Sequence, residues 1–265
     1  MELNLAGKRV VVTGGGSNIG RAITLAFARE HSHVTIAEID EAQGKKVAAE
    51  ASSAGAASAT VVRTDVTSWE SVLAMVNEVG ARLGGVDILI NNVGWTIDRL
   101  FVEKTREEWE KEIRLNLWGM INCTRAALDG MIARKAGAIV SLGSDAGRMG
   151  EFREGVYAAC KAGVIALSKS LAREVGRHGI RLNVVCPGMT IPQSDEEISG
   201  LSMWAQEATR QFNTPDMKAR IAKAYPLRRI GRSDDVAAAV VFLASDAASF
   251  ITGQTLSVSG GYTMM

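Results

Sequence analysis

The chain has 265 residues, 47% of them hydrophobic, which is enough for one large α/β domain with a sizeable core. Thirty basic residues against 29 acidic ones leave a formal net charge of +1, so the composition gives no electrostatic footprint for nucleic acid. No apolar run approaches the roughly 18 residues needed to span a bilayer, and no basic-then-apolar leader opens the chain. We therefore exclude a disordered chain, and we expect a cytoplasmic protein that binds neither nucleic acid nor membrane.

The cysteines and histidines do not predict a metal site. Cys123, Cys160 and Cys186 are odd in number and widely spaced, which fits neither a disulfide framework nor a zinc knuckle. The histidines have no cysteine or carboxylate at ligand spacing. We therefore expect no metal.

Short β-branched runs alternate with longer segments of helical period along the chain. We predict strands over 8–13, 33–38, 59–64, 86–91, 138–144, 180–186 and 254–259. We predict helices over about 18–30, 41–54, 68–83, 105–134, 155–177 and 233–245. Several strand runs are apolar on both faces, as strands covered by helices on each side must be. Because strand and helix alternate with no linker, the sequence predicts one α/β domain over 1–265, a doubly wound parallel sheet of about seven strands.

Residues 189–225 depart from this alternation and form an insertion after a strand. The segment carries two prolines, an acidic patch at 195–197 and an amphipathic stretch over 201–212. Ligands bind beside the carboxyl ends of strands in open α/β sheets, so we predict a substrate loop that acts as a lid. The alternative is a helix that packs on the core or on another subunit.

A glycine-rich turn joins the first predicted strand to the first predicted helix. The turn reads Thr13-Gly-Gly-Gly-Ser-Asn-Ile-Gly20. Glycines serve where the backbone turns with positive φ and where it approaches a pyrophosphate, which then lies on the amide groups and positive dipole of the following helix. The strand before and the helix after this turn give the context that a dinucleotide site requires.

An acidic residue closes the second predicted strand. The Glu38 carboxylate can accept hydrogen bonds from the adenosine ribose hydroxyls and would repel a 2′-phosphate. No Lys or Arg follows directly, because the next residues are Ile39, Asp40 and Glu41. Glu38 therefore favours NAD over NADP, and the alternative is a solvated acid at a strand end.

Tyr157 and Lys161 are spaced to share one face of a helix. A phenol titrates near 10 in isolation, too high for efficient proton exchange near neutral pH. One ammonium at about 4 Å supplies roughly 4 kcal/mol, enough to lower the phenol pKa by about three units. Tyr157 is then a candidate general acid and base, although this spacing also occurs in ordinary amphipathic helices.

Together these motifs resemble the short-chain dehydrogenase/reductase family over essentially the whole chain. The resemblance rests on TGGGSNIG, NNVG at 91–94, Ser144, YAACK at 157–161, Pro187-Gly188 and the closing ITGQTLSVSGG. It implies a Rossmann-type fold and an NAD cofactor. It also implies a homo-oligomer, a tetramer or dimer built through the two long helices and the C-terminal strand region.

The resemblance also implies a catalytic tetrad of Asn116, Ser144, Tyr157 and Lys161. Ser144 would hydrogen-bond the substrate oxygen and Tyr157 would exchange its proton, while Lys161 holds the nicotinamide ribose and depresses the tyrosine pKa. Asn116 would hold a water that continues the proton relay. The implied cofactor contacts, besides Tyr157 and Lys161, are Gly14, Ser17, Asn18, Ile19, Gly20, Glu38, Asp65, Val66, Asn92, Gly94, Pro187, Gly188 and Thr190.

Three positions depart from the family pattern. Asn18 stands where the family has a glycine, but asparagine tolerates left-handed backbone better than most residues, so we expect the turn to survive. Val93 replaces an alanine and crowds the cofactor pocket. Pro192 stands where the family often has a threonine for the carboxamide, so Thr190 is the candidate for that role.

Within the family the motifs are most similar to 2-hydroxycyclohexanecarboxyl-CoA dehydrogenases and related β-hydroxyacyl-CoA dehydrogenases. This similarity implies NAD-dependent oxidation of a secondary alcohol β to a thioester, with a cyclic or branched acyl group. Two alternatives stay open: a free secondary alcohol, sugar or ketone as substrate, and a catalytically silent structural subunit. Candidate contacts to an apolar ring are Trp95, Met149 and Trp204, and candidate contacts to a CoA tail are Arg148, Arg153 and Arg210.

Overall fold

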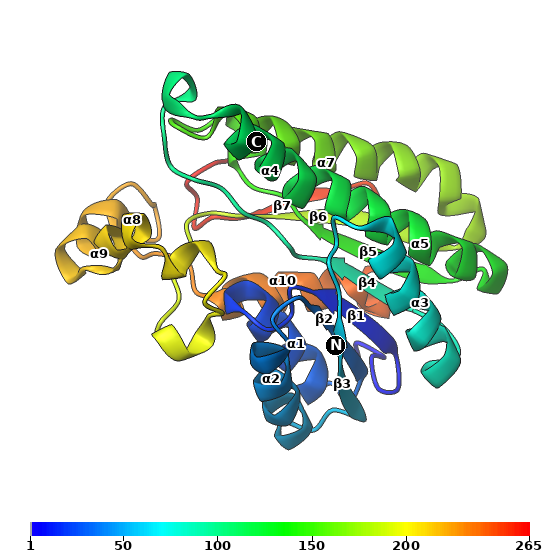
Figure 1. Cartoon of the computed structure of the whole chain (residues 1–265). Coiled ribbons are helices and arrows are strands. Elements are labelled where there is room, and N and C mark those ends of the chain that lie inside the picture. Colours follow the sequence, from blue (N-terminus) through cyan, green and yellow to red (C-terminus); the bar gives the residue numbers. More distant parts are fainter. Residues whose placement is uncertain (1) are drawn as a thin grey trace.

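The computed structural model describes residues 2–265 and contains a seven-stranded sheet whose pairings are all parallel (Figure 1). The strand order is β3-β2-β1-β4-β5-β6-β7, so the chain changes direction across the sheet between β1 and β4. The strands are β1 (Arg9–Thr13), β2 (His33–Glu38), β3 (Ser58–Arg63), β4 (Ile88–Asn91), β5 (Gly137–Leu142), β6 (Ile180–Pro187) and β7 (Thr255–Val258). This confirms the predicted fold class, with strand ends within two residues of the predicted ones.

Helices cover both faces of the sheet (Figure 1). They are α1 (Asn18–Arg29), α2 (Glu41–Ser53), α3 (Trp69–Leu83), α4 (Arg106–Ile113), α5 (Gly119–Arg134), α6 (Ala146–Met149), α7 (Gly155–Val175), α8 (Glu207–Arg210), α9 (Pro215–Ala222) and α10 (Ser233–Ala244). Val10 and Val12 pack in the core cluster with α1, α2 and α10, whereas Val11 packs in the cluster with α3, α5 and α7. Successive strand residues point to opposite faces, and a doubly covered strand is therefore apolar throughout.

The single helix predicted over 105–134 is divided in the structure. A π-helical segment, Arg114–Trp118, separates α4 from α5, and such segments often occur at functional sites. Gly119 begins α5 where an added Cβ would lie 2.8 Å from a side-chain carbon of Val66, so the absence of a side chain lets the helix approach the end of β3. Hydrophobic periodicity in the sequence does not reveal the π-helical segment, because α5 continues α4 in the same direction.

The insertion over 189–225 folds into short helices. Its tip, 194–200, lies against α1 and α2, while α8 and α9 project from the body of the molecule (Figure 1). None of the helices described over 2–265 has an apolar stretch long enough to cross a membrane.

Candidate active site

The glycine-rich turn packs tightly between β1 and α1. Gly14 has φ +61°, and a Cβ at Gly20 would lie only 2.0 Å from the Gly14 carbonyl oxygen. Asn92 fastens the turn from β4, because its Nδ2 donates to the carbonyls of Thr13 at 3.0 Å and Gly14 at 3.1 Å. The side chain of Val93 crowds the same turn, since its Cγ2 would lie 3.1 Å from a Cβ at Gly14. The turn therefore requires glycine at both positions, and it sets the first amides of α1 at the switch point of the sheet.

Asn18 adopts the left-handed conformation expected of the glycine that it replaces, with φ +44°. Its side chain also connects two distant segments. Asn18 Nδ2 donates to the Thr190 carbonyl at 3.4 Å, and Ser233 Oγ donates to Asn18 Oδ1 at 2.6 Å. The asparagine therefore ties the turn to the insertion and to the start of α10, which a glycine cannot do.

Glu38 is buried at the end of β2, with 7% of its surface exposed. Its carboxylate accepts hydrogen bonds from the backbone N–H groups of Gly16 at 3.1 Å and Ile39 at 2.9 Å. Burial raises the pKa of Glu38, and these hydrogen bonds lower it in part. The alternative of a solvated acid is therefore wrong, and the carboxylate lies beside the glycine turn.

Asn116, Ser144, Tyr157 and Lys161 come from three separate elements: the π-helical segment, the turn after β5, and α7. Lys161 is buried, donates from Nζ to the Leu142 carbonyl at 2.8 Å, and lies 5.5 Å from the centroid of the Tyr157 ring. A Cβ added to Gly94 would lie 3.1 Å from Asn116 Oδ1 and 3.3 Å from Lys161 Nζ. The structure therefore brings Asn116 and Lys161 together at Gly94, with Tyr157 beside Lys161 and Ser144 within hydrogen-bonding reach of Tyr157.

The acid–base properties of the pair differ from the expectation that an ammonium would lower the tyrosine pKa. Burial raises the pKa of Tyr157 above its ordinary value, and the charge of Glu154 raises it further, while a hydrogen bond with Ser144 lowers it in part. Burial also lowers the pKa of Lys161 to about 8. Desolvation disfavours the charged form of both groups, so the phenol stays protonated.

The other predicted cofactor residues lie at the carboxyl ends of β3 and β6. Asp65 accepts hydrogen bonds from the backbone N–H and hydroxyl of Thr67, at 2.9 and 2.7 Å, and Val66 is buried. The Thr190 hydroxyl donates to the Gly188 carbonyl at 3.1 Å, so its proton is used within the loop. These strand ends share the edge of the sheet that carries the glycine turn.

The tip of the insertion touches elements that form the predicted cofactor site, a contact that the sequence does not predict. The residues next to Ser199 in the sequence form no motif that predicts this contact. The Ser199 backbone N–H donates to Ser17 Oγ at 3.2 Å, and its hydroxyl donates to Asp40 Oδ2 at 2.7 Å. Arg21 on α1 lies 3.6 Å from the carboxylate of Glu197 in the tip. The tip is thus attached to α1 and α2.

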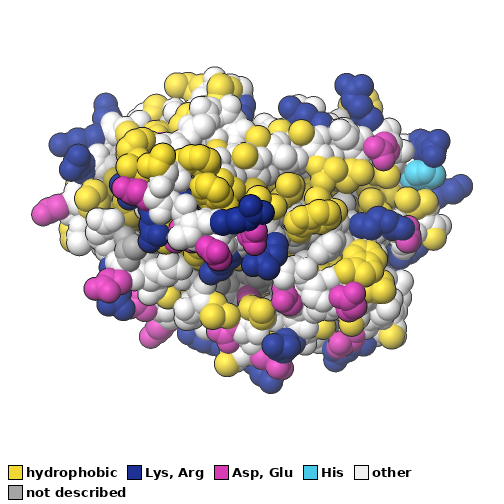
Figure 2. Space-filling model, turned by 45° about the horizontal axis from the view of Figure 1, so that its top comes forward, with side chains coloured by type: hydrophobic (Ala, Val, Ile, Leu, Met, Phe, Trp, Pro, Cys, Tyr) yellow, Lys and Arg dark blue, Asp and Glu magenta, His cyan; other side chains and the backbone are white. Residues whose placement is uncertain are grey.

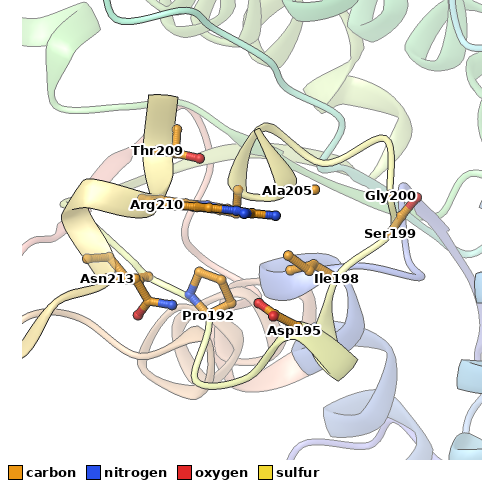
Figure 3. A pocket seen from close by; sticks show the side chains of 11 residues that line it. Pro192, Asp195, Ile198, Ser199, Gly200, Ala205, Thr209, Arg210 and Asn213 are labelled. Atoms are coloured by element: carbon orange, nitrogen blue, oxygen red, sulfur yellow. The ribbon is translucent and has the colours of Figure 1, made fainter. Parts of the chain in front are cut away.

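A cavity of about 240 Å³ lies inside the insertion (Figure 3). Trp204 and Arg210 line it together with residues 191–200, and Arg210 extends into it above Pro192 and Ile198. No tetrad residue belongs to the lining of this cavity. Trp95 is buried, with 8% exposed.

The remaining candidate arginines are engaged within the chain. Arg153 Nε lies 2.7 Å from Asp98 Oδ1, and Arg148 Nη1 lies 4.0 Å from Asp145 Oδ1. Both side chains are thus paired with carboxylates of the chain, whereas Arg210 lines the cavity.

Nearly the whole chain matches known proteins and one family model. Residues 14–263 match a family model described as enoyl-(acyl carrier protein) reductase. The chain is 35% identical over 257 residues to 3-oxoacyl-[acyl-carrier-protein] reductase FabG of Staphylococcus aureus (strain Mu50), covering 97% of this chain and 98% of that protein. It is 37% identical over 263 residues to the Escherichia coli (strain K12) protein of the same name, covering 99% and 100%.

A solved structure has the same architecture. The crystal structure of gox2181 superposes with a TM-score of 0.87 at 35% identity, covering 98% of this chain and 97% of the other. Family match, identity and fold extend over nearly the entire sequence. The chain therefore belongs to the short-chain dehydrogenase/reductase family of oxidoreductases.

Proposed function

We propose that this protein is an NAD-dependent oxidoreductase that interconverts the β-hydroxyl and β-keto groups of an acyl thioester. The observation that carries the proposal is the convergence of Asn116 and Lys161 on Gly94, with Tyr157 and Ser144 beside them. Relatives named as reductases of 3-oxoacyl groups support the thioester class of substrate.

The described residues fit a dinucleotide. The glycines at 14–16 let a pyrophosphate approach the backbone closely, and the turn offers it the positive end of a twelve-residue helix. Glu38 would bind the adenosine ribose, Asp65 and Val66 would border the adenine, and Lys161 would hold the nicotinamide ribose. Asn92 and Gly94 would line the nicotinamide side, with Pro187, Gly188 and Thr190 opposite. The nicotinamide supplies the hydride acceptor or donor.

Residues of the chain itself donate and accept the proton. Ser144 donates a hydrogen bond to the substrate oxygen, and Tyr157 gives its phenolic proton to that oxygen in reduction or takes it in oxidation. Because burial raises the pKa of Tyr157, the phenol holds its proton at neutral pH, which is the state that reduction needs. Asn116 orients the relay that returns a proton to the phenol.

The acyl group that we propose is cyclic or branched, as in the CoA dehydrogenases that the motifs resemble. The test follows NADH consumption with a cyclic β-ketoacyl-CoA, a linear β-ketoacyl thioester on CoA or acyl carrier protein, the free cyclic acid and a simple cyclic ketone. Turnover of thioesters alone supports the proposal, and preference among them identifies the acyl group and the carrier. Turnover of the free ketone alone contradicts it in favour of a small-alcohol dehydrogenase.

The catalytic role of Tyr157 has a matched control in the same chain. Tyr157→Phe removes the proton donor, so kcat should fall about 10²- to 10⁴-fold while NADH binding, followed by fluorescence, stays close to wild type. Tyr262 lies near the C-terminus, where its hydroxyl donates to Glu151, and Tyr262→Phe should keep most activity. Near-wild-type turnover by Tyr157→Phe would show that this assignment is wrong.

We also propose that the protein works as a homo-oligomer. Hydrophobic side chains gather on the face that carries α4, α5 and α7 (Figure 2). On or beside these helices, Trp118 is 53% exposed, Phe101 57% and Phe152 74%. Burial of these groups against a second copy would stabilise the assembly.

A further inference from the structure

Lys104 and Glu112 form a buried ion pair next to Asn116, and neither partner takes part in the proton transfer proposed above. Lys104 Nζ is 2.6 Å from Glu112 Oε1, and the two side chains are 1% and 0% exposed. Taking two charges out of water costs several kcal/mol per ion, and an apolar pair of similar volume is often equally stable or more so. Glu112 Oε2 adds to this cost, because it has no hydrogen-bond partner among residues 2–265. The pair is therefore poorly explained by stability alone.

Glu112 holds the turn that follows Gly94. Its Oε1 accepts hydrogen bonds from the Thr96 hydroxyl at 2.8 Å and from the Ile97 backbone N–H at 3.4 Å, besides the one from Lys104. Three donors from the segment after β4 thus meet on one carboxylate oxygen of α4.

Asn116 holds the same turn from one helical turn further on. Its Nδ2 donates to the Trp95 carbonyl at 2.6 Å, and its Oδ1 accepts from the Trp95 backbone N–H at 3.1 Å. The same Nδ2 also donates to the Glu112 backbone carbonyl at 2.8 Å. Glu112 and Asn116 therefore fix consecutive residues, 95–97, beside the point where Asn116 and Lys161 approach Gly94.

We propose that the Lys104–Glu112 pair is a positioning device: it fixes the 95–97 turn, and through it the place of Asn116 relative to Lys161 and Tyr157. This inference rests on the proposed oxidoreductase function. Lys104 neutralises a carboxylate that has to lie inside the protein to reach Thr96 and Ile97 together.

Two double variants separate positioning from packing. K104M/E112Q and K104M/E112L both remove the buried charges, but only glutamine keeps an oxygen that accepts from Thr96 and Ile97. We expect K104M/E112L to lower kcat about 10- to 100-fold with little change in KM, because small displacements of catalytic groups are costly. K104M/E112Q should keep kcat within about threefold of wild type, since it preserves those hydrogen bonds.

The split between kcat and KM gives a readout that a loss of stability alone would not move. Thr96→Val keeps both buried charges and breaks only the hydrogen bond from the Thr96 hydroxyl to Glu112 Oε1. This variant should therefore also lower kcat with little change in KM, and recovery of kcat in K104M/E112Q relative to K104M/E112L would assign the effect to the hydrogen bonds on residue 112.

The outcomes are distinct. If K104M/E112L keeps wild-type kcat, the positioning role is overturned while the proposed function stands. If K104M/E112L does not fold, Thr96→Val decides, and unchanged kcat in that variant overturns the proposal. A wild-type protein that binds NADH but reduces no ketone overturns the proposed function and this inference together.

Discussion

At the scale of single residues, burial governs which groups in the site carry a proton. The carboxyl of Glu154 lies three residues before Tyr157, and its pKa is raised to about 7, first by burial and then by the charges of Glu151 and Asp98. Its negative charge raises the pKa of Tyr157 in turn. Acidic residues outside the YAACK motif therefore influence the pKa values of groups in the site.

Glu154→Gln should change stability in a pH-dependent way. The pKa of Glu154 is about 7 in the folded chain against an ordinary 4.5, so the folded state binds the proton more tightly. The wild type keeps this stabilisation below pH 4.5 and loses it as pH rises to 7. Denaturant unfolding at pH 8 should find the glutamine variant more stable by up to about 3 kcal/mol. The difference should vanish at pH 4, and an equal gain at both pH values would contradict the assignment.

Cofactor choice is also decided by single residues. Glu38→Ala with Ile39→Arg removes the carboxylate that would repel a 2′-phosphate and adds a cation to bind it. The ratio of kcat/KM for NADPH over NADH should rise about tenfold or more, equivalent to ~1.4 kcal/mol. Ile39→Arg alone is the control for the added charge, and an unchanged ratio in the double variant would refute the role of Glu38.

The sequence predicts the tetrad and misses the residues that support it. Tyr157, Lys161 and Ser144 belong to a local motif with fixed spacing, and the structure brings them together as that motif implies. Lys104 and Glu112 look like ordinary surface charges in sequence. Only the fold shows that α4 turns Glu112 inward, although a carboxylate four residues before Asn116 is a signal that a spacing search could use.

At the scale of elements, the insertion is the part of the fold that periodicity describes least. Strands and long helices follow from repeated apolar positions, whereas 189–225 is held by contacts to residues far away in sequence. Ser199 reaches Asp40 across 159 positions and Ser17 across 182. The tip of the insertion is therefore attached to elements that form the predicted cofactor site.

Ser199→Ala should weaken cofactor binding rather than chemistry. The variant loses the hydrogen bond to Asp40 that helps attach the tip to α2. One hydrogen bond contributes about 1 kcal/mol, so the Kd for NADH should rise about fivefold while kcat changes little. Ser194 precedes a short 3₁₀ helix and makes no capping hydrogen bond, so Ser194→Ala is the matched control. Equal NADH affinity in wild type and Ser199→Ala would exclude a role for the tip in holding the cofactor.

At the scale of the whole molecule, one face stays apolar after the sheet is covered. α5 packs on β4 and β5, and the π-helical segment that precedes it leaves Trp118 more than half exposed. Such a surface is costly in water unless a second molecule covers it.

Trp118→Glu should separate the assembly into smaller species. Light scattering coupled to size exclusion gives the mass of each variant directly, and a shift toward monomer is expected because a charge would be buried in the interface. Leu73 is similarly apolar and 39% exposed but lies on α3, so Leu73→Glu should leave the mass unchanged. A Trp118→Glu protein with wild-type mass would show that this face is not the interface.

The position of α10 has a consequence for how the protein is made. Val236, Val240 and Leu243 of α10 complete the core cluster that contains Val10 and Phe27 from the start of the chain. A ribosome delivers these late residues only after the six strands β1 to β6 have been made, so the nascent protein carries an uncovered apolar layer through much of its synthesis. Products that terminate before Ser233 also lack the partner of Asn18 at the glycine turn. We expect such truncated chains to depend on chaperones and to gain little protection from added NADH, because the glycine turn lacks its contact with the start of α10.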